Sequence, residues 1–135
     1  MGIFDKMFGS SNGSSNERNT KKEDKVLPWQ ALTEVSQLSE IEKRSQTKTQ
    51  LIFKHSTRCG ISSMVMKQFV SMYDLEANFD LYYLDLLNYR EVSNEVGYTF
   101  QVIHQSPQLL IIKNRTTVAH ASHGAINDLD LKRFE

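Results

Sequence analysis

The sequence has only one cysteine, Cys59, among its 135 residues, which excludes an internal disulfide. It has no excess of charge of either sign, because 16 lysines and arginines balance 16 aspartates and glutamates. That balance argues against broad electrostatic binding to nucleic acid or to an anionic membrane surface. No apolar run is long enough to span a bilayer, the longest being residues 109–112. These absences predict a cytoplasmic protein in a reducing compartment.

Apolar side chains are unevenly distributed along the chain. Residues 10–25 contain only polar, glycine and charged residues, which cannot offset the entropy cost of ordering, so we expect a disordered leader over residues 1–25. Residues 26–135 are long enough for one domain with one hydrophobic core. One short apolar helical face lies ahead of the polar stretch and represents either a docking peptide or a frayed terminus; it consists of Ile3, Phe4, Met7 and Phe8.

The spacing of apolar residues predicts alternating strands and helices through residues 26–135. The predicted strands cover residues 25–31, 51–53, 81–86, 109–113 and 116–121. The predicted helices cover residues 33–44, 59–75, 88–100 and 126–134. This order predicts an α/β fold with a mostly parallel sheet, one antiparallel hairpin and helices on both faces.

Local patterns refine individual elements of this fold. Asn88 and Glu91 resemble a capping box, and the pair Asn114-Arg115 suits a hairpin turn. Pro28 is tolerated in the first strand only at a sheet edge or at the start of the strand. The core-facing stripe of the long helix is expected to consist of Ile61, Met64, Val65, Phe69, Met72 and Tyr73.

Cys59 is the residue that points most clearly to chemistry. It follows a predicted buried strand and a turn, and it begins the predicted helix 59–75. The free amides and the dipole at a helix N-terminus favour a thiolate over a thiol, and Arg58 adds positive charge. Because the thiolate is the reactive form, the pattern predicts a nucleophile. The alternative is an inert, buried cysteine that packs as a small hydrophobe.

A second thiol is missing where a dithiol oxidoreductase would have one. Cys59, Gly60 and Ile61 are followed by Ser62, whose hydroxyl cannot resolve a mixed disulfide. Any redox cycle at this cysteine must therefore use a thiol from another molecule.

Pro107 precedes the predicted strand 109–113 and is a second indication of a site. A cis bond between Ser106 and Pro107, beside the cysteine, would leave the backbone of Ser106 free to pair with a substrate chain. In the alternative interpretation, this proline simply begins a strand.

The four histidines give weaker signals. His55 and His104 either lie near Cys59 and tune its charge or occupy ordinary surface positions. His120 and His123 are close in sequence, but no third ligand is evident nearby, so we predict no metal site.

Two segments resemble the monothiol bacilliredoxins, the YtxJ-like proteins of Gram-positive bacteria. The first runs from Phe53 to Ser63 and the second from His104 to Gln108, and the similarity extends from about Trp29 to Ile126. The resemblance implies that residues 26–135 form a thioredoxin-like domain, with a central mixed sheet flanked by helices on both faces. This agrees with the order of elements predicted above.

The resemblance also implies an activity, which is removal of bacillithiol from S-bacillithiolated proteins during oxidative stress. Bacillithiol is a low-molecular-weight thiol that caps protein cysteines as mixed disulfides. Cys59 would attack the bacillithiol sulfur and take over the cap, and a second bacillithiol or another redox protein would then clear it. Bacillithiol is thus a co-substrate, no tightly bound cofactor is implied, and the partners are capped proteins and the bacillithiol-reducing system.

We expect the substrate to contact the residues around the cysteine and the proline. The anionic malate group of bacillithiol would lie at the helix N-terminus, beside Arg58 and the amides of residues 61–63. The residues expected to bind substrate are Arg58, Gly60, Ile61, Ser62, Ser106 and Pro107.

Position 60 departs from the family, which commonly has Cys-Pro-Ile-Ser at this motif. Gly60 makes the motif similar to the Cys-Gly-Phe-Ser of monothiol glutaredoxins, which bridge a [2Fe–2S] cluster between two protomers. One alternative function is therefore an iron–sulfur carrier with bacillithiol as a co-ligand. Another is a thioredoxin-fold adaptor whose cysteine is incidental.

Overall fold

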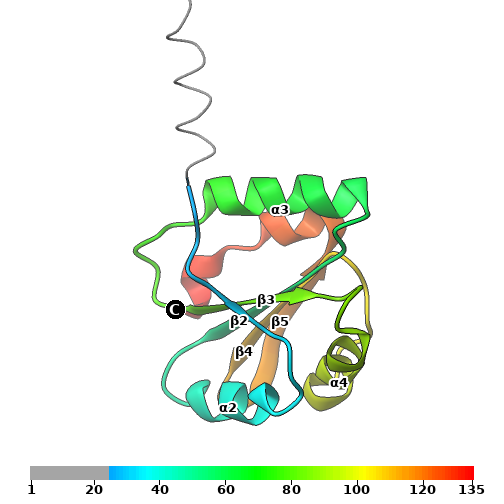
Figure 1. The fold of residues 1–135 in the computed structure, drawn as a ribbon. Coiled ribbons are helices and arrows are strands. Elements are labelled where there is room, and N and C mark those ends of the chain that lie inside the picture. The colour runs from blue at the N-terminus through cyan, green and yellow to red at the C-terminus, as the bar shows by residue number, and fades with distance from the viewer. Residues whose placement is uncertain (1–24) are drawn as a thin grey trace, which may run out of the picture.

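The computed structural model describes residues 25–135, which form a five-stranded sheet with helices on both faces (Figure 1). The strands are β1 (Trp29–Ala31), β2 (Gln50–His55), β3 (Asp80–Asp85), β4 (Gln108–Lys113) and β5 (Thr116–Ser122). The helices are α2 (Gln37–Arg44), α3 (Gly60–Met72) and α4 (Arg90–Phe100), followed by the 3₁₀ helices η2 (His123–Asp128) and η3 (Leu131–Phe134). The predicted alternation of strands and helices is confirmed.

The sheet has the strand order β1-β3-β2-β4-β5 and is mixed. β1 and β2 both pair with β3 in parallel, whereas β4 is antiparallel to both β2 and β5. The expectation of a mostly parallel sheet was wrong at β4. The loop after α4 brings the chain back to the end of the sheet at which β2 ends, so β4 runs antiparallel to β2. Lys54 of β2 therefore lies opposite Gln108, the first residue of β4.

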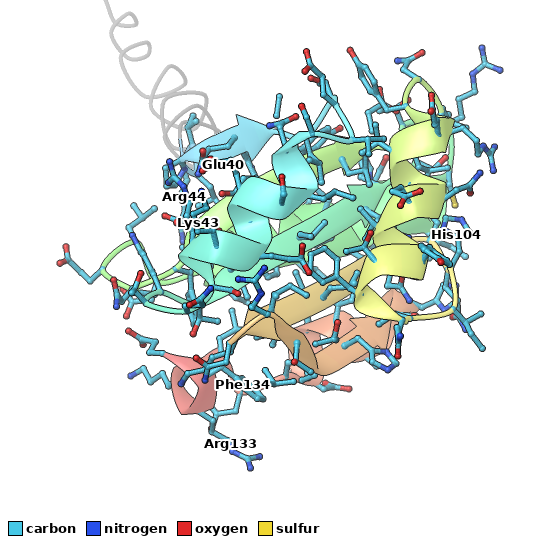
Figure 2. The ribbon with its side chains drawn as sticks, turned by 90° about the horizontal axis from the view of Figure 1, so that it is seen from below. Glu40, Lys43, Arg44, His104, Arg133 and Phe134 are labelled. Atoms are coloured by element: carbon cyan, nitrogen blue, oxygen red, sulfur yellow. The ribbon has the colours of Figure 1, made fainter. Side chains whose placement is uncertain are left out.

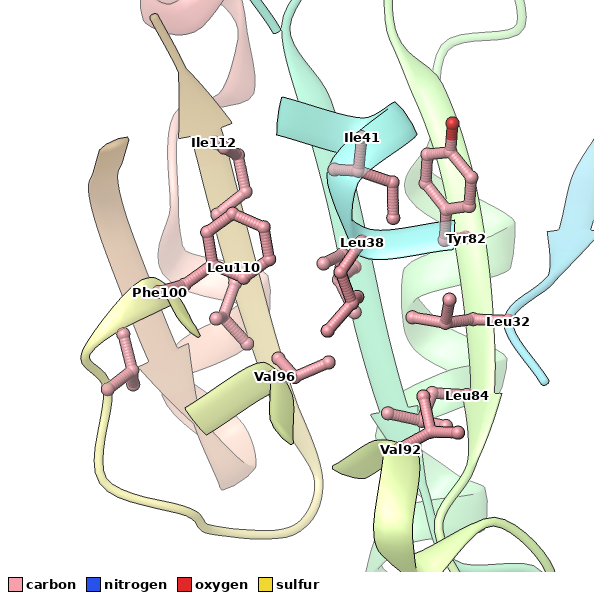
Figure 3. Close-up of a cluster of buried hydrophobic side chains, with 12 residues drawn as sticks. Leu32, Leu38, Ile41, Tyr82, Leu84, Val92, Val96, Phe100, Leu110 and Ile112 are labelled. Atoms are coloured by element: carbon pink, nitrogen blue, oxygen red, sulfur yellow. The ribbon is translucent and has the colours of Figure 1, made fainter. Parts of the chain in front are cut away.

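Alternation along the strands divides the apolar core between the two faces of the sheet. One cluster lies between the sheet and the pair α2 and α4, and includes Ile52, Leu84, Val96 and Leu110 (Figure 3). The other lies on the face covered by α3 and η2 (Figure 1). Each strand of the sheet centre is thus buried on both sides, which explains its near-continuous apolar sequence.

The core-facing stripe of α3 is narrower than predicted. Val65, Phe69 and Tyr73 are buried, but Ile61, Met64 and Met72 are more than half exposed; their exposed fractions are 56%, 55% and 66%. The buried line begins at Ser62, which the prediction omitted because its side chain is polar. Including residues from both sides of this line widened the predicted stripe beyond one helix face.

The C-terminal segment is not the single helix predicted for residues 126–134. It forms η2 and η3, which are separated at Leu129, where the backbone is extended (φ −72°, ψ 135°). Ile126, Leu129 and Phe134 still pack on the α3 side of the sheet. The apolar residues therefore reach the core from two short turns, a pattern that helical spacing alone does not distinguish from one helix.

The predicted capping box at the start of α4 was also wrong. The N-cap residue is Tyr89, and the side-chain amide of Asn88 instead donates a hydrogen bond to the carboxylate of Asp85, at 2.8 Å. Two other local predictions are confirmed. Asn114 and Arg115 both have positive φ in the hairpin turn, and Pro28 directly precedes the edge strand β1.

The first described residue, Lys25, is tied to the C-terminal end of α3. Its ammonium donates hydrogen bonds to the carbonyls of Ser71 and Tyr73, at 3.1 and 2.7 Å. The predictions for residues 1–24, a disordered leader with a short apolar face, lie outside the described residues, so the domain division stays a prediction. Within residues 25–135, no helix has the length and apolar character needed to cross a membrane.

Candidate active site

Cys59 is the N-cap residue of α3 and is half-buried. It follows β2 and the turn of residues 56–58, and its amide donates to the carbonyl of Ser56 at 3.2 Å. Its own carbonyl accepts the first bond of the helix, from the amide of Ser63 at 3.0 Å. The amides of residues 60–62 precede that first bond and so have no acceptor within the helix. The expected set of free amides, residues 61–63, was therefore wrong at Ser63, whose amide is used by the helix. The thiol therefore lies at the amide end of α3, as the sequence predicts.

Ser62 connects the helix to the strand and the turn that precede it. Its side chain is fully buried, and its hydroxyl oxygen lies 2.7 Å from Nδ1 of His55. The same oxygen accepts a hydrogen bond from the amide of Ser56, at 3.1 Å. Its hydroxyl thus has internal partners, and the residue as a whole is 0% exposed. The expected contact between Ser62 and substrate therefore does not agree with the structure.

His55 is buried, with an exposed fraction of 7%, so the alternative of a surface position was wrong for this residue. Its ring packs edge-on against Tyr83, with the ring centres 5.7 Å apart. Burial lowers the pKa of His55 below its usual value, and the nearby charge of Asp85 opposes that shift. The imidazole is therefore neutral at pH 7. Its hydrogen bond to Ser62 links the end of β2 to the first turn of the helix that begins at Cys59.

Lys54 is a buried cation that the sequence analysis did not single out. It precedes His55 on β2 and is 0% exposed, and burial lowers the pKa of its ammonium to about 8. Its Nζ donates to the carbonyl of Ser93 in α4 at 3.2 Å and lies 3.3 Å from Nδ1 of His104. Among the described residues, no carboxylate forms an ion pair with it. A lone charged residue inside an apolar strand was the signal available in the sequence.

His104 lies beside α4, on the face of the sheet opposite to α3 (Figure 2). Its Nδ1 is 3.4 Å from the hydroxyl of Ser93 as well as 3.3 Å from the ammonium of Lys54. Partial burial and the positive charges of Lys54 and Arg90 lower the pKa of His104. The two histidines expected near the cysteine thus bond to groups on opposite faces of the sheet.

The peptide bond between Ser106 and Pro107 is cis, as the functional interpretation of the sequence expects. Pro107 is buried and Ser106 half-buried. The carbonyl of Pro107 accepts a hydrogen bond from the amide of His123, at 3.0 Å. Because Lys54 pairs with Gln108, Pro107 lies at the end of the sheet at which β2 ends and the turn to Cys59 begins.

The remaining candidates lie on the surface of the turn and the first helical residues. Arg58, Gly60 and Ile61 are exposed and adjoin the cysteine, so they are accessible to a substrate. His120 and His123 are exposed too. In the part of the chain that the structure describes, no group of three or more potential ligands could hold a metal ion.

Comparison with known proteins agrees with this geometry. Residues 30–131 match the family model of the monothiol bacilliredoxin BrxC. The chain belongs to the monothiol bacilliredoxin family. The family resemblance seen in the sequence is thereby confirmed.

Solved structures that are similar to this chain have the thioredoxin fold. A structure described as having a thioredoxin fold is 29% identical, with a TM-score of 0.66, over 76% of this chain and 89% of the other. The thioredoxin of Malassezia sympodialis is 17% identical, with a TM-score of 0.63, over 81% and 92%. The thioredoxin of Fasciola hepatica is 12% identical, with a TM-score of 0.62, over 78% and 99%. The predicted thioredoxin-like fold is confirmed, and family and fold together support a thiol redox role.

Proposed function

We propose that the protein is a cytoplasmic thiol–disulfide oxidoreductase that removes bacillithiol from S-bacillithiolated proteins during oxidative stress. The observation that supports this most directly is the position of Cys59, a half-buried thiol at the N-cap of α3 with a serine in place of a resolving thiol. Bacillithiol is the co-substrate, and the chain needs no tightly bound cofactor for this reaction.

In the first step, the thiolate of Cys59 attacks the bacillithiol sulfur of the capped protein. A new disulfide forms between Cys59 and bacillithiol as the old one breaks, and the target cysteine leaves as a thiolate. The free amides of residues 60–62 and the positive end of the helix dipole lie at Cys59, a position typical of nucleophilic cysteines. The exchange is redox-neutral, because one disulfide is replaced by another.

In the second step, a thiol from outside the chain clears the enzyme. A bacillithiol thiolate attacks the bacillithiol sulfur on Cys59, which regenerates the Cys59 thiolate and releases bacillithiol disulfide. Over the two steps, one incoming bacillithiol replaces the target cysteine as the disulfide partner of the cap. The two electrons of a net reduction are supplied later, when the bacillithiol-reducing system reduces the released bacillithiol disulfide. Ser62 takes no part in this exchange, because an alcohol does not resolve a disulfide.

The exposed groups around Cys59 suit the two halves of the capped substrate. The malate group of bacillithiol is anionic, and Arg58 with the amides of the exposed residues Gly60 and Ile61 would provide positive charge and donors for it. The target's backbone would pair with that of Ser106, beside Pro107. Both contacts are parts of the proposal.

The proposal is tested by reduction of a purified S-bacillithiolated protein in the presence of bacillithiol. Cys59→Ser removes the nucleophile and is expected to abolish the reaction. Ser62→Ala is expected to retain most of the activity per folded molecule, because the hydroxyl it removes bonds only to groups inside the protein. Equal activity of Cys59→Ser and the wild-type protein would contradict the proposal.

A cluster carrier remains the alternative, and it has a distinct signature. The chain supplies one thiolate, so a [2Fe–2S] cluster would need a second copy and two external thiols. Anaerobic reconstitution with iron, sulfide and bacillithiol would then yield a coloured dimer with visible absorbance. A colourless monomer would exclude the carrier, and loss of both activities would leave the adaptor.

A further inference from the structure

Lys54 is a buried charge that the proposed exchange reaction does not use. Its side chain is 0% exposed, and its partners are the carbonyl of Ser93 and Nδ1 of His104. No carboxylate of residues 25–135 pairs with it, and an ammonium buried in this way is unfavourable for stability compared with an apolar side chain of similar size. Its presence therefore calls for a role other than stabilising the fold.

One of the two partners of Lys54, His104, belongs to the loop that carries the cis proline. Lys54 and Gln108 are opposite each other in the antiparallel pair β2 and β4, so their side chains lie on the same face of the sheet. Gln108 is 1% exposed and donates through Nε2 to the carbonyl of Ile103, at 2.9 Å. Lys54 and Gln108 thus hold two consecutive residues, Ile103 and His104, of the segment that leads to Pro107.

The bond from Lys54 also determines which nitrogen of His104 carries its proton. An ammonium has no lone pair, so at 3.3 Å from Nζ the Nδ1 atom must act as the acceptor. A neutral imidazole with Nδ1 as acceptor carries its hydrogen on Nε2. Nδ1 faces the buried ammonium, so Nε2–H is the ring donor left for a partner other than Lys54, and His104 is exposed as a residue.

We infer that Lys54 is a positioning residue that holds His104 as the Nε2–H tautomer, so that His104 donates a hydrogen bond to an oxygen acceptor of the S-bacillithiolated substrate. This inference rests on the proposed function and deepens it, because it adds a recognition contact next to the Ser106–Pro107 backbone. The acceptor belongs either to the bacillithiol cap or to the target chain, and these sources share the same chemistry. Lys54 itself touches no substrate.

The first test is the tautomer, which is measured without any activity assay. Imidazole ¹⁵N shifts at pH 7 are expected to show His104 as Nε2–H in the wild-type protein and as a mixture of tautomers in Lys54→Met. The control, Lys43→Met, removes an exposed lysine of α2 and is expected to leave these shifts unchanged. A wild-type His104 protonated on Nδ1, or a tautomer unaffected by Lys54→Met, would overturn the inference.

The second test separates binding from turnover in the reduction of an S-bacillithiolated protein. Lys54→Met and His104→Ala are each expected to raise KM about fivefold to tenfold, the effect of one lost hydrogen bond, and to change kcat less than twofold. The double variant should lose no more than either single variant, because both remove the same contact. His104→Gln keeps an acceptor for Lys54 and a donor for substrate, so it should restore KM to within about twofold of the wild-type value.

The remaining outcomes separate this inference from a purely structural role of Lys54 and identify the source of the acceptor. Lys54→Met with wild-type KM and reduced stability would show a merely structural lysine and overturn the inference. A KM increase confined to a bacillithiol-capped protein, and absent from the same protein capped with cysteine, would assign the acceptor to bacillithiol; equal increases would assign it to the target chain. An inactive wild-type protein would contradict the proposed function, while the tautomer measurement would still decide the role of Lys54.

Discussion

Lys54 and His55 are neighbours on β2 and both are buried, but their side chains lie on opposite faces of the sheet. His55 faces α3, is neutral, and shares a short hydrogen bond with the hydroxyl of Ser62. Lys54 faces α4, where a carbonyl and an imidazole nitrogen surround its ammonium. On one face, a neutral pair holds the helix of Cys59. On the other face, the loop before Pro107 is held by a cation that pairs with no carboxylate in the described part of the chain.

This difference shows that two parts of one site are stabilised in different ways. A neutral pair with its hydrogen bonds satisfied stabilises the fold and has no penalty for burying charge. A buried ammonium is unfavourable for stability and is retained, in our account, for the geometry that it imposes on His104. Stability measurements on the two faces should consequently respond in opposite directions to removal of the polar group.

The largest expected effect is a pH-dependent destabilisation by Lys54. Its pKa is about 8 in the folded protein and about 10.5 in the unfolded chain. Between these values the unfolded chain binds more protons, so stability should rise with pH from 8 to 10.5. Relative to Lys54→Met, the wild-type protein should gain on the order of 3 kcal/mol over that range.

Urea unfolding of both proteins at several pH values measures this gain. Taking the difference between the two cancels the effect of Tyr73, Tyr82 and Tyr83, whose raised pKa values make the folded protein lose stability above pH 10. The nearby groups His104 and Arg90 are also present in both proteins. A difference in unfolding free energy that stays constant from pH 7 to 10 would show that Lys54 has no depressed pKa.

An intermediate and opposite effect is expected on the α3 face. Ser62→Ala leaves Nδ1 of His55 and the amide of Ser56 without their partner, which should reduce the unfolding free energy by about 1–3 kcal/mol. Ser63→Ala is the matched control, and it should change stability by less than about 0.5 kcal/mol. Chemical denaturation at pH 7 measures both, and equal stabilities for the two variants would argue against the stabilising pair.

The smallest effect is expected at Gly60, where the family commonly has proline. Cys59 has φ −102° and ψ 123°, the extended backbone that a residue before proline prefers, and no atom lies within 4 Å of a Cβ added at Gly60. Proline is also favoured at the first position of a helix. Gly60→Pro should therefore raise the unfolding free energy by about 0.4–1 kcal/mol, mainly by restricting the unfolded chain. Thermal unfolding measures this change, and a lower Tm would show that the turn depends on glycine.

Most of the fold follows from the sequence, because buried strands and amphipathic helices have different apolar spacing. The N-cap position of Cys59 was also within reach of local patterns, whereas the cis bond before Pro107 was one of two alternatives that the sequence left open. The direction of β4 could not be predicted from local patterns, because it depends on where the loop after α4 returns the chain. Apolar spacing also did not place Ser62 on the buried line of α3.

The two polar clusters depend on strand register and on alternation between sheet faces. The sequence shows Lys54 and His104 fifty positions apart, and only the pairing of β2 with β4 brings them to one face. His55 meets Ser62 because the turn of residues 56–58 folds the helix back over the end of its own strand. Such contacts join separate elements, so local propensity does not reveal them.

The most direct test of the account is the transfer of the bacillithiol cap to Cys59 in a single turnover. The protein is mixed with an S-bacillithiolated target in the absence of free bacillithiol, and intact-mass and peptide mass spectrometry then locate the cap. The account predicts one bacillithiol on Cys59 for each target thiol released, and no transfer to Cys59→Ser. A cap that stays on the target, or equal transfer to Cys59→Ser, would contradict it.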